Sequence, residues 1–303
     1  MPSIFWTGKL SPTTKLMANF SNAIAWITGN ARDSAAMKER VKKGYEGAVT
    51  DDVTRYDEFG LQHYTRISKA LLEGTDLQGK AVLDVGCGTG ILSLLALEQG
   101  CAHVVCGDLS EYMLSQCREK AIALGYGPDR IDFRMLDAES LPFESNSFDA
   151  VISGMVLGFI PNQKSAVAEM VRLLRPGGVL AISTHGPELY YEAIEASFRS
   201  VPKNIVLGYR IEYWPRKEKD IYRMFSEAGL IDVRTRQLTW KDSFENGNSA
   251  YKFFASVSAL WWCTKFSLEK IALVSQKIRT AFERKPVKQI TTDIILAYGR
   301  KPS

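Results

Sequence analysis

Hydrophobic and polar positions follow a regular pattern between residues 80 and 183 of the chain. Short apolar runs rich in β-branched residues alternate there with longer segments of helical period. Strands are predicted over residues 81–85, 103–107, 131–135, 148–153 and 179–183, and helices over residues 91–99, 111–124 and 164–174. Such alternation predicts an α/β fold with parallel strands and helical crossovers on both faces of the sheet.

The residues before this region show helical periodicity without such alternation. Ser11-Pro12 is a typical helix start, and the apolar residues that follow are spaced as on one helix face. These residues are Leu16, Met17, Phe20, Ile24 and Ile27. We expect this face to pack on the body of the protein, with a lid over a ligand site or a contact with a membrane or partner as alternatives. Further helices are expected over residues 34–43 and 64–72, joined by an aromatic-rich link.

Beyond residue 183 the pattern becomes irregular. Helices are predicted over residues 188–198 and 217–228, strands over 231–239 and 292–298, and an insertion between the two strands holds an aromatic helix over 250–263 and a basic one over 268–282. The sequence therefore predicts four parts. They are a helical N-terminal extension (1–50), a core (51–243), a helical aromatic insertion (244–290) and a last core strand with a tail (291–303).

The first predicted strand runs directly into a glycine-rich turn, AVLDVGCGTGI over residues 81–91. Gly86, Gly88 and Gly90 lack the Cβ atoms that would keep a ligand away from the backbone, which favours a ligand cradle. A tight strand-to-helix turn without a ligand is the alternative. Dinucleotide-binding turns read G-x-G-x-x-G, but Ile91 stands at the last position here, so nicotinamide and flavin cofactors are disfavoured.

An acidic residue, Asp108, ends the second predicted strand. A carboxylate at this place can accept both hydroxyl hydrogens of a ribose, as in nucleoside-binding α/β folds. Asp is also a good helix N-cap, but Ser110 can cap the next helix equally well. We therefore predict a ribose contact for Asp108.

A series of motifs in a fixed order carries a family resemblance. The G-x-G-x-G turn behind Asp84 resembles the first motif of class I S-adenosylmethionine (AdoMet) methyltransferases. The runs Leu141-Pro142-Phe143, Phe148-Asp149 and Leu174-Arg175-Pro176-Gly177-Gly178 are similar to small-molecule methyltransferases, including the ubiquinone and menaquinone C-methyltransferases. The resemblance spans about residues 45 to 240 plus the final strand. It implies a doubly wound, mostly parallel seven-stranded sheet of the Rossmann-like type, with AdoMet as cofactor and S-adenosylhomocysteine as product.

The same resemblance implies roles at the third strand end. A carboxylate there takes the adenine amino group and the next backbone amide meets a ring nitrogen, which matches Asp137 and Ala138. Aromatic faces near the sulfonium would add cation–π attraction, for which Tyr45, Tyr56 and Phe159 are candidates. The predicted cofactor-binding residues are Asp84, Gly86, Cys87, Gly88, Gly90, Asp108, Leu109, Asp137, Ala138, Ser153, Tyr45 and Tyr56.

The acceptor side is less defined by the sequence. His185 follows the fifth strand, and its pKa range suits a general base, with a structural histidine as the alternative. Enzymes that methylate base amines commonly carry an (N/D)-P-P-(F/Y) turn after the fourth strand, where this chain has Ser153-Gly154-Met155-Val156. Together with the aromatic insertion, this difference predicts a small apolar or aromatic acceptor, covered by the extension and the insertion. The predicted acceptor-side residues are Met155, Phe159, His63 and Trp261.

Composition narrows the remaining classes. With 46% hydrophobic and 24% charged residues the chain is typical of soluble globular proteins, and a net charge of +4 is too small to indicate nucleic-acid binding. The five cysteines contain no C-x-x-C pair, so we expect reduced thiols and neither disulfides nor a metal site. No apolar stretch or signal pattern indicates a membrane span, and we expect a cytoplasmic protein of unknown oligomeric state.

Two alternatives stay open at this point. One is a catalytically silent AdoMet-fold protein that acts as a binding subunit. The other is a membrane-surface methyltransferase acting on a lipid or quinone, suggested by Ile4-Phe5-Trp6 and by basic positions in and just after the second insertion helix. These basic positions are Lys270, Lys277, Arg279, Arg284 and Lys285.

Overall fold

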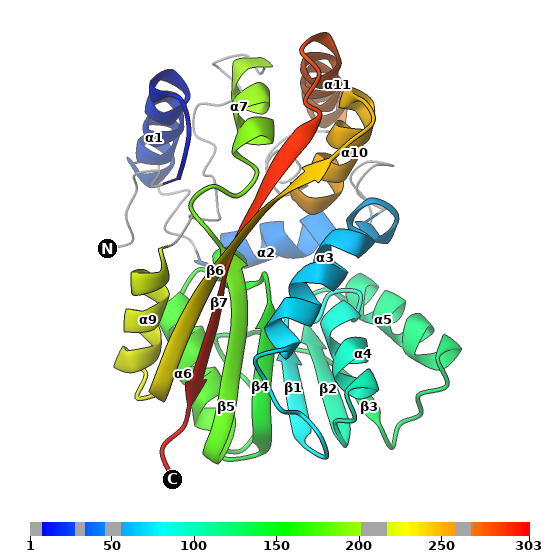
Figure 1. Ribbon diagram of the computed structural model, residues 1–303, viewed down its shortest axis with the longest axis vertical. Coiled ribbons are helices and arrows are strands. Elements are labelled where there is room, and N and C mark those ends of the chain that lie inside the picture. The colour runs from blue at the N-terminus through cyan, green and yellow to red at the C-terminus, as the bar shows by residue number, and fades with distance from the viewer. Residues whose placement is uncertain (1–7, 28–33, 46–55, 201–216, 259–267) are drawn as a thin grey trace. The chain divides into compact units, whose positions relative to one another are not determined.

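The computed structural model describes residues 8–27, 34–45, 56–200, 217–258 and 268–303 (Figure 1). The chain forms two compact units. The sheet unit consists of residues 61–184, 217–237 and 295–303, and the helical unit consists of residues 1–60, 185–216 and 238–294. The boundaries predicted at residues 50, 243 and 290 stay a prediction.

Seven strands form one sheet in the order β3-β2-β1-β4-β5-β7-β6. Their bounds are β1 Ala81–Val85, β2 His103–Asp108, β3 Ile131–Met135, β4 Phe148–Gly154, β5 Leu174–His185, β6 Ile231–Ser243 and β7 Gln289–Arg300. The pairs β1–β2, β2–β3, β1–β4 and β4–β5 are parallel. This confirms the predicted seven-stranded, mostly parallel α/β fold. Strand order reverses between β1 and β4, which is where ligands bind in open sheets of this kind.

Both faces of the sheet are covered. The helices of the sheet unit are α3 Tyr56–Leu72, α4 Ile91–Glu98, α5 Glu111–Ala123, α6 Gln163–Leu173 and α9 Glu218–Glu227, with a short 3₁₀ helix, η1, over Leu157–Phe159. The first turn of α3 belongs to the helical unit. Leu83 and Val85 of β1 share a buried cluster with side chains of α6 and α9. The alternate β1 residues Val82 and Asp84 are also buried and point to the opposite face. This burial on both faces explains the continuous apolar runs in the sequence.

Several predicted bounds are wrong. Helix α3 begins at Tyr56, inside the predicted aromatic link, because Asp57 and Glu58 in its first turn favour a helix N-terminus. Strand β5 begins at Leu174, where the preceding helix is predicted to end and five residues before the predicted strand, and its pairing with β4 shifts register between Phe148 and Ala150. Strands β6 and β7 are both longer than predicted.

The helical unit has an aromatic core. Its helices are α1 Pro12–Ile27, α2 Ser34–Tyr45, α7 Tyr191–Ser200, α10 Gly247–Ser258 and α11 Leu268–Arg284. Phe254 of α10 stacks on Phe282 of α11 with ring centroids 5.8 Å apart, and Tyr251 meets Phe282 edge-on at 6.1 Å. Phe253 lies edge-on to Tyr190 at 6.0 Å. The apolar character of the insertion is therefore used, at least in part, for packing within this unit.

Helix α1 does not bury the face that its sequence predicts. Leu16 is 70% exposed and Phe20 is 58% exposed, whereas Thr14 and Ala18 are buried. The reason is a polar tether to α7. The Ser11 N–H donates to Glu195 at 3.0 Å, the Thr14 hydroxyl donates to it at 2.7 Å, and the Ser11 hydroxyl also binds this carboxylate.

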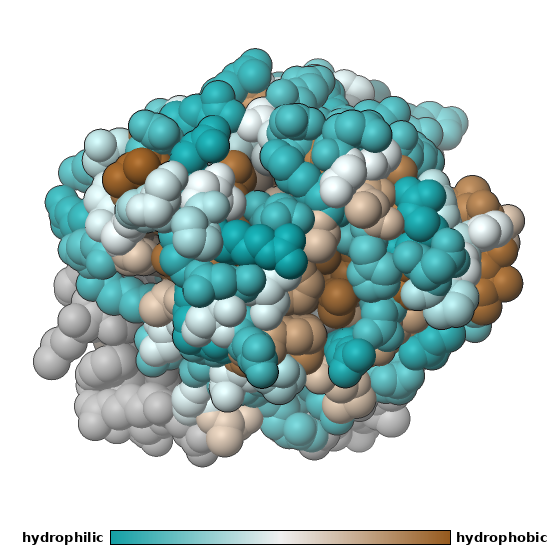
Figure 2. All heavy atoms as spheres, turned by 90° about the horizontal axis from the view of Figure 1, so that it is seen from below, coloured by the Kyte–Doolittle hydropathy of each residue, from teal (hydrophilic) through white to brown (hydrophobic). Residues whose placement is uncertain are grey.

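The surface carries some further apolar side chains. Figure 2 shows a mostly hydrophilic face with hydrophobic side chains gathered in places. In the sheet unit, Ile122 of α5 and Met135 of the edge strand β3 are exposed, as is Leu124. Within the described ranges, no helix has both the length and the apolar character needed to cross a membrane.

We predict that Glu195→Gln loosens α1 and lowers the free energy of unfolding by about 1.5–3 kcal/mol, the usual contribution of hydrogen bonds to a charged group. Partial burial raises the pKa of Glu195, but the bonds from Ser11 and Thr14 outweigh it, so the pKa is lowered overall. The stabilisation is thus present above the pKa of an unfolded glutamate and is lost as the pH falls through the folded value.

Urea denaturation at neutral and acid pH measures this effect, with Glu119→Gln, an exposed residue of α5, as the matched control. Equal stability of Glu195→Gln and the wild type at neutral pH would contradict the prediction.

Candidate functional site

The loop between β1 and α4 is tied to the neighbouring strand. The N–H groups of Gly86 and Cys87 both donate to the carbonyl oxygen of Gly107 on β2, at 2.7 and 3.0 Å. Gly86, Gly88 and Gly90 have φ angles of 75°, 55° and 87°. The glycines of this loop, residues 86–90, thus adopt a left-handed conformation that other residues rarely adopt. We call this segment the glycine loop.

The three glycines differ in what surrounds them. A Cβ at Gly86 would lie 2.4 Å from Val156, and one at Gly90 would lie 2.3 Å from the Cys117 Sγ. A Cβ at Gly88 would have no neighbour within 4 Å. Protein atoms therefore fill the space beside Gly86 and Gly90, and only Gly88 leaves open room of the kind that was predicted for a ligand.

Asp108 joins the end of β2 to the glycine loop. Its Oδ2 accepts the Gly88 N–H and its Oδ1 accepts the Ser110 N–H, both at 2.9 Å. Ser110 caps α5 by accepting the Met113 N–H at 3.3 Å, so the alternative role of Asp108 as N-cap is filled by Ser110. Burial raises the pKa of Asp108, against the effect of these backbone hydrogen bonds. Each carboxylate oxygen retains a further lone pair for a ligand hydroxyl.

Asp84 is a buried carboxylate beside the loop. Its Oδ2 accepts the Ser93 hydroxyl at 2.6 Å, whereas its Oδ1 has no hydrogen-bond partner among the described residues. Burial raises the pKa of Asp84 to about 7. An unsatisfied buried oxygen is uncommon in folded proteins, and a ligand cation or N–H group would satisfy it. Ser153 at the end of β4 is buried, and its hydroxyl donates to the Val85 carbonyl at 2.7 Å.

The third strand end carries the remaining predicted cofactor residues. The Asp137 Oδ1 accepts the Glu139 N–H at 3.0 Å, which forms a local turn around Ala138. Leu136 is buried and lies against Gly107, and Leu109 is half-buried. Because β1, β2 and β3 are parallel, their carboxyl ends meet at one edge of the sheet. The structure thus brings the glycine loop, Asp84, Asp108 and Asp137 to that edge.

Met155 follows the end of β4 in a strained conformation. Its φ is 60°, and its buried backbone N–H lies within hydrogen-bond distance of two acceptors on Ser183, the carbonyl oxygen at 2.9 Å and the Oγ at 3.1 Å. A long side chain in the left-handed region costs about 1–2 kcal/mol and is often found at functional sites. Phe159 ends η1 and is partly buried. These two acceptor-side residues belong to the same unit as the glycine loop, Asp84, Asp108 and Asp137.

The other predicted residues are placed as follows. His63 is buried on α3 with its ring 5.1 Å from Tyr64. Tyr45 and Tyr56 meet edge-on at 6.4 Å, and with the buried His185 at the end of β5 they belong to the helical unit. Trp261 lies outside the described residues. The roles assigned to these residues stay predictions.

The sequence did not indicate that three cysteines converge. The Sγ atoms of Cys87, Cys106 and Cys117 lie within 4.8 Å of one another. The pKa of the Cys117 thiol is lowered, because Cys106 and Cys87 hydrogen-bond to its sulfur and Lys120 and Arg118 are near. The three cysteines lie in a loop, a strand and a helix that are separated along the chain, so their spacing shows no C-x-x-C pattern.

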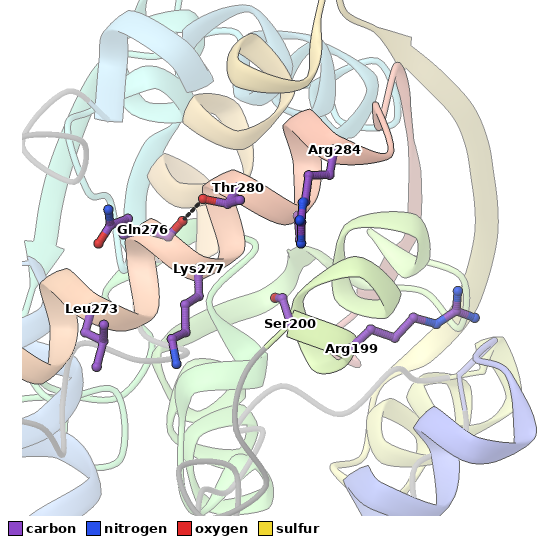
Figure 3. Close-up of a pocket in the computed structure, with 8 residues that line it drawn as sticks. Arg199, Ser200, Leu273, Gln276, Lys277, Thr280 and Arg284 are labelled. Atoms are coloured by element: carbon purple, nitrogen blue, oxygen red, sulfur yellow. Dashed lines mark hydrogen bonds between the residues drawn. The ribbon is translucent and has the colours of Figure 1, made fainter.

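A separate hollow lies in the helical unit (Figure 3). It measures about 580 Å³ and is bordered by α7 and α11. Its lining includes Lys277, Arg284 and Arg199, and the Arg199 guanidinium donates to Glu195 at 2.8 Å. This basic, hydroxyl-bearing hollow shares no residue with the predicted cofactor or acceptor set.

Comparison with known proteins gives consistent matches. A family model described as "Methyltransferase domain" matches residues 83–182. The chain is 34% identical over 226 residues to a demethylmenaquinone methyltransferase of Clavibacter sepedonicus, covering 65% of this chain and 87% of that protein. It is 31% identical over 160 residues to an uncharacterized protein of Mycobacterium tuberculosis, covering 53% of this chain and 57% of the relative. The match thus spans little more than half the length of that relative.

A solved structure shows the same fold. The phosphoethanolamine N-methyltransferase 2 of Haemonchus contortus, in complex with phosphomonomethylethanolamine and S-adenosylhomocysteine, superposes with a TM-score of 0.54 at 19% identity. The superposition covers 86% of this chain and 60% of that one. At this identity the likeness concerns the fold.

We predict that alanine substitutions in the glycine loop differ in cost. Gly88→Ala should lower the free energy of unfolding by about 1 kcal/mol, the cost of a left-handed alanine. Gly90→Ala should cost about 2–4 kcal/mol, because overpacking against buried Cys117 adds to that strain. Thermal and urea unfolding of both variants measure the difference, and a Gly90→Ala protein as stable as Gly88→Ala would contradict the packing described.

Proposed function

We propose that this chain, which belongs to the family of class I AdoMet-dependent small-molecule methyltransferases, transfers the methyl group of AdoMet to a small apolar or aromatic acceptor. The observation that supports cofactor binding most directly is the hydrogen bond from the Gly88 N–H to Asp108. Through this hydrogen bond, a carboxylate that could bind a ribose lies next to Gly88. Of the three loop glycines, Gly88 is the one at which an added Cβ would have no neighbour within 4 Å. A nucleoside can therefore approach the backbone there without a steric clash.

Each polar group at the sheet edge can be paired with a part of AdoMet that it would bind. Asp108 would accept the two ribose hydroxyl hydrogens through its remaining lone pairs. Asp137 would accept the adenine amino group, with the Ala138 N–H facing a ring nitrogen and Leu109 and Leu136 as apolar walls. The unsatisfied Asp84 Oδ1 fits a cationic amino group, whose charge would favour ionisation of a carboxyl with a raised pKa.

When bound, AdoMet would supply a methyl group that its sulfonium already activates. Displacement in line with the S–CH₃ bond would release S-adenosylhomocysteine as the leaving group. The protein then has to orient the acceptor and exclude water, and orientation alone can contribute about 7–11 kcal/mol to lowering a barrier. Met155 is suited to orientation, because its backbone is strained and its N–H lies within hydrogen-bond distance of two Ser183 oxygens. His185 would remove a proton where the acceptor has one to lose.

The acceptor class rests on the residues after β4 and on the relatives. Gly154, Met155 and Val156 offer no polar side chain to hold a base amine. The relative from Clavibacter sepedonicus is named for demethylmenaquinone, which is an apolar aromatic molecule. Both observations support an acceptor with an apolar ring.

Calorimetry with S-adenosylhomocysteine tests cofactor binding. We expect one site in the wild type and an affinity about ten- to a hundredfold lower in Asp108→Asn, since hydrogen bonds to a charged group contribute about 1.5–3 kcal/mol. The matched control is Asp129→Asn, at an exposed residue of the same unit. Circular dichroism verifies that each variant is folded. Absence of binding to the folded wild type would defeat the proposal.

Turnover with a panel of acceptors tests the second half of the proposal. Formation of S-adenosylhomocysteine should be measured with naphthoquinols, phenols and polar amines at equal concentration. We expect product with the apolar aromatic acceptors and little with the amines. Cofactor binding without product from any acceptor would instead favour a binding subunit without catalytic activity.

A further inference from the structure

Three cysteines of the sheet unit converge beside the glycine loop. Cys87 lies in the loop, Cys106 on β2 and Cys117 on α5, and all three side chains are buried. Each sulfur lies within 4.8 Å of the other two. One buried cysteine is ordinarily a small hydrophobic side chain, but three sulfurs that meet at one point form a set of ligand atoms.

The backbone holds these sulfurs from three directions. The Cys87 N–H donates to the carbonyl of Gly107, the residue after Cys106, at 3.0 Å. The Cys117 sulfur occupies the place that a Cβ of residue 90 would fill, so Gly90 is what allows α5 to bring it in. The Cys87 thiol also donates to the Gly88 carbonyl oxygen at 3.6 Å. The trio is therefore preorganised by the fold.

We propose that Cys87, Cys106 and Cys117 bind one soft d¹⁰ metal ion, of the class of Zn(II), Cu(I) and Cd(II). Sulfur ligands select these ions over Mg(II) and Ca(II), which prefer oxygen. Among the described residues, the group close enough to share an ion consists of these three cysteines. Cu(I) is satisfied by three sulfurs, while Zn(II) and Cd(II) would take a fourth ligand from water or a small molecule.

Binding exchanges protons for the metal. Each thiol that becomes a ligand releases one proton to solvent and forms one metal–sulfur bond, and neither sulfur nor metal changes oxidation state. Lys120 and Arg118 lie near Cys117 and offset part of the thiolate charge. Lys120 is held in this region by a 3.1 Å hydrogen bond from its Nζ to the Thr89 carbonyl.

Titration of the reduced protein with Cd(II) tests the site, because sulfur-to-cadmium charge transfer absorbs in the ultraviolet and reports thiolate ligands. All proteins carry Cys263→Ser, since residue 263 lies outside the described residues. We expect a band that saturates at one equivalent of Cd(II) and three sulfur ligands by X-ray absorption spectroscopy. Mg(II) at the same concentration should neither compete nor bind.

Matched variants locate the site. Cys87→Ser, at the least buried of the three, should lower the Cd(II) affinity at least tenfold, and Cys101→Ser, at a buried cysteine outside the trio, should leave it unchanged. Circular dichroism accompanies each titration. If Cys87→Ser does not fold, the sulfur count in the wild type decides alone. No band, fewer than three sulfur ligands, or an equal loss in Cys101→Ser would overturn the proposal.

This test contains no methyl donor or acceptor. A failure of metal binding would therefore leave the proposed methyl transfer unaffected, and a failure of cofactor binding would leave the metal site unaffected.

Discussion

The hydrogen bond between the Gly88 N–H and the Asp108 carboxylate is the contact on which the site depends. It joins the turn after β1 to the end of β2, across twenty residues of sequence, and the parallel pairing of Val85 with Gly107 brings the two parts together. A carboxylate held in this way by backbone amides is fixed in position before any ligand arrives. Preorganised polar groups of this kind bind a ligand without a large cost for ordering it.

The same edge of the sheet buries groups that are costly to bury. Asp84 lies between two strands with one oxygen unsatisfied, and its raised pKa reflects the loss of water around it. Three buried thiols, one of them in the glycine loop, lie within 4.8 Å of one another. Burying such polar groups costs free energy, and the surrounding apolar strands of the sheet offset that cost.

The helical unit is organised differently. Its aromatic residues pack on one another, as Phe254 does on Phe282, and its first helix is attached through the Glu195 carboxylate. Aromatic residues that suggested an acceptor pocket in the sequence are thus also the core of this unit. An aromatic side chain can serve packing and a pocket wall at once, because its two faces contact different neighbours.

The sequence by itself determined the first five strands of the chain, the α/β class and the acidic residues at the strand ends, because local periodicity and turn residues carry that information. It also indicated the glycine loop and Asp108, whose alternative role as a cap is filled by Ser110. Only the tertiary structure decided why residues 86 and 90 are glycine, since Val156 and Cys117 reach them from distant parts of the chain. The exposure of Leu16 and Phe20 and the meeting of three cysteines were likewise decided by tertiary contacts. The physical reason is that register and packing between residues far apart in sequence leave no periodic signal along the chain.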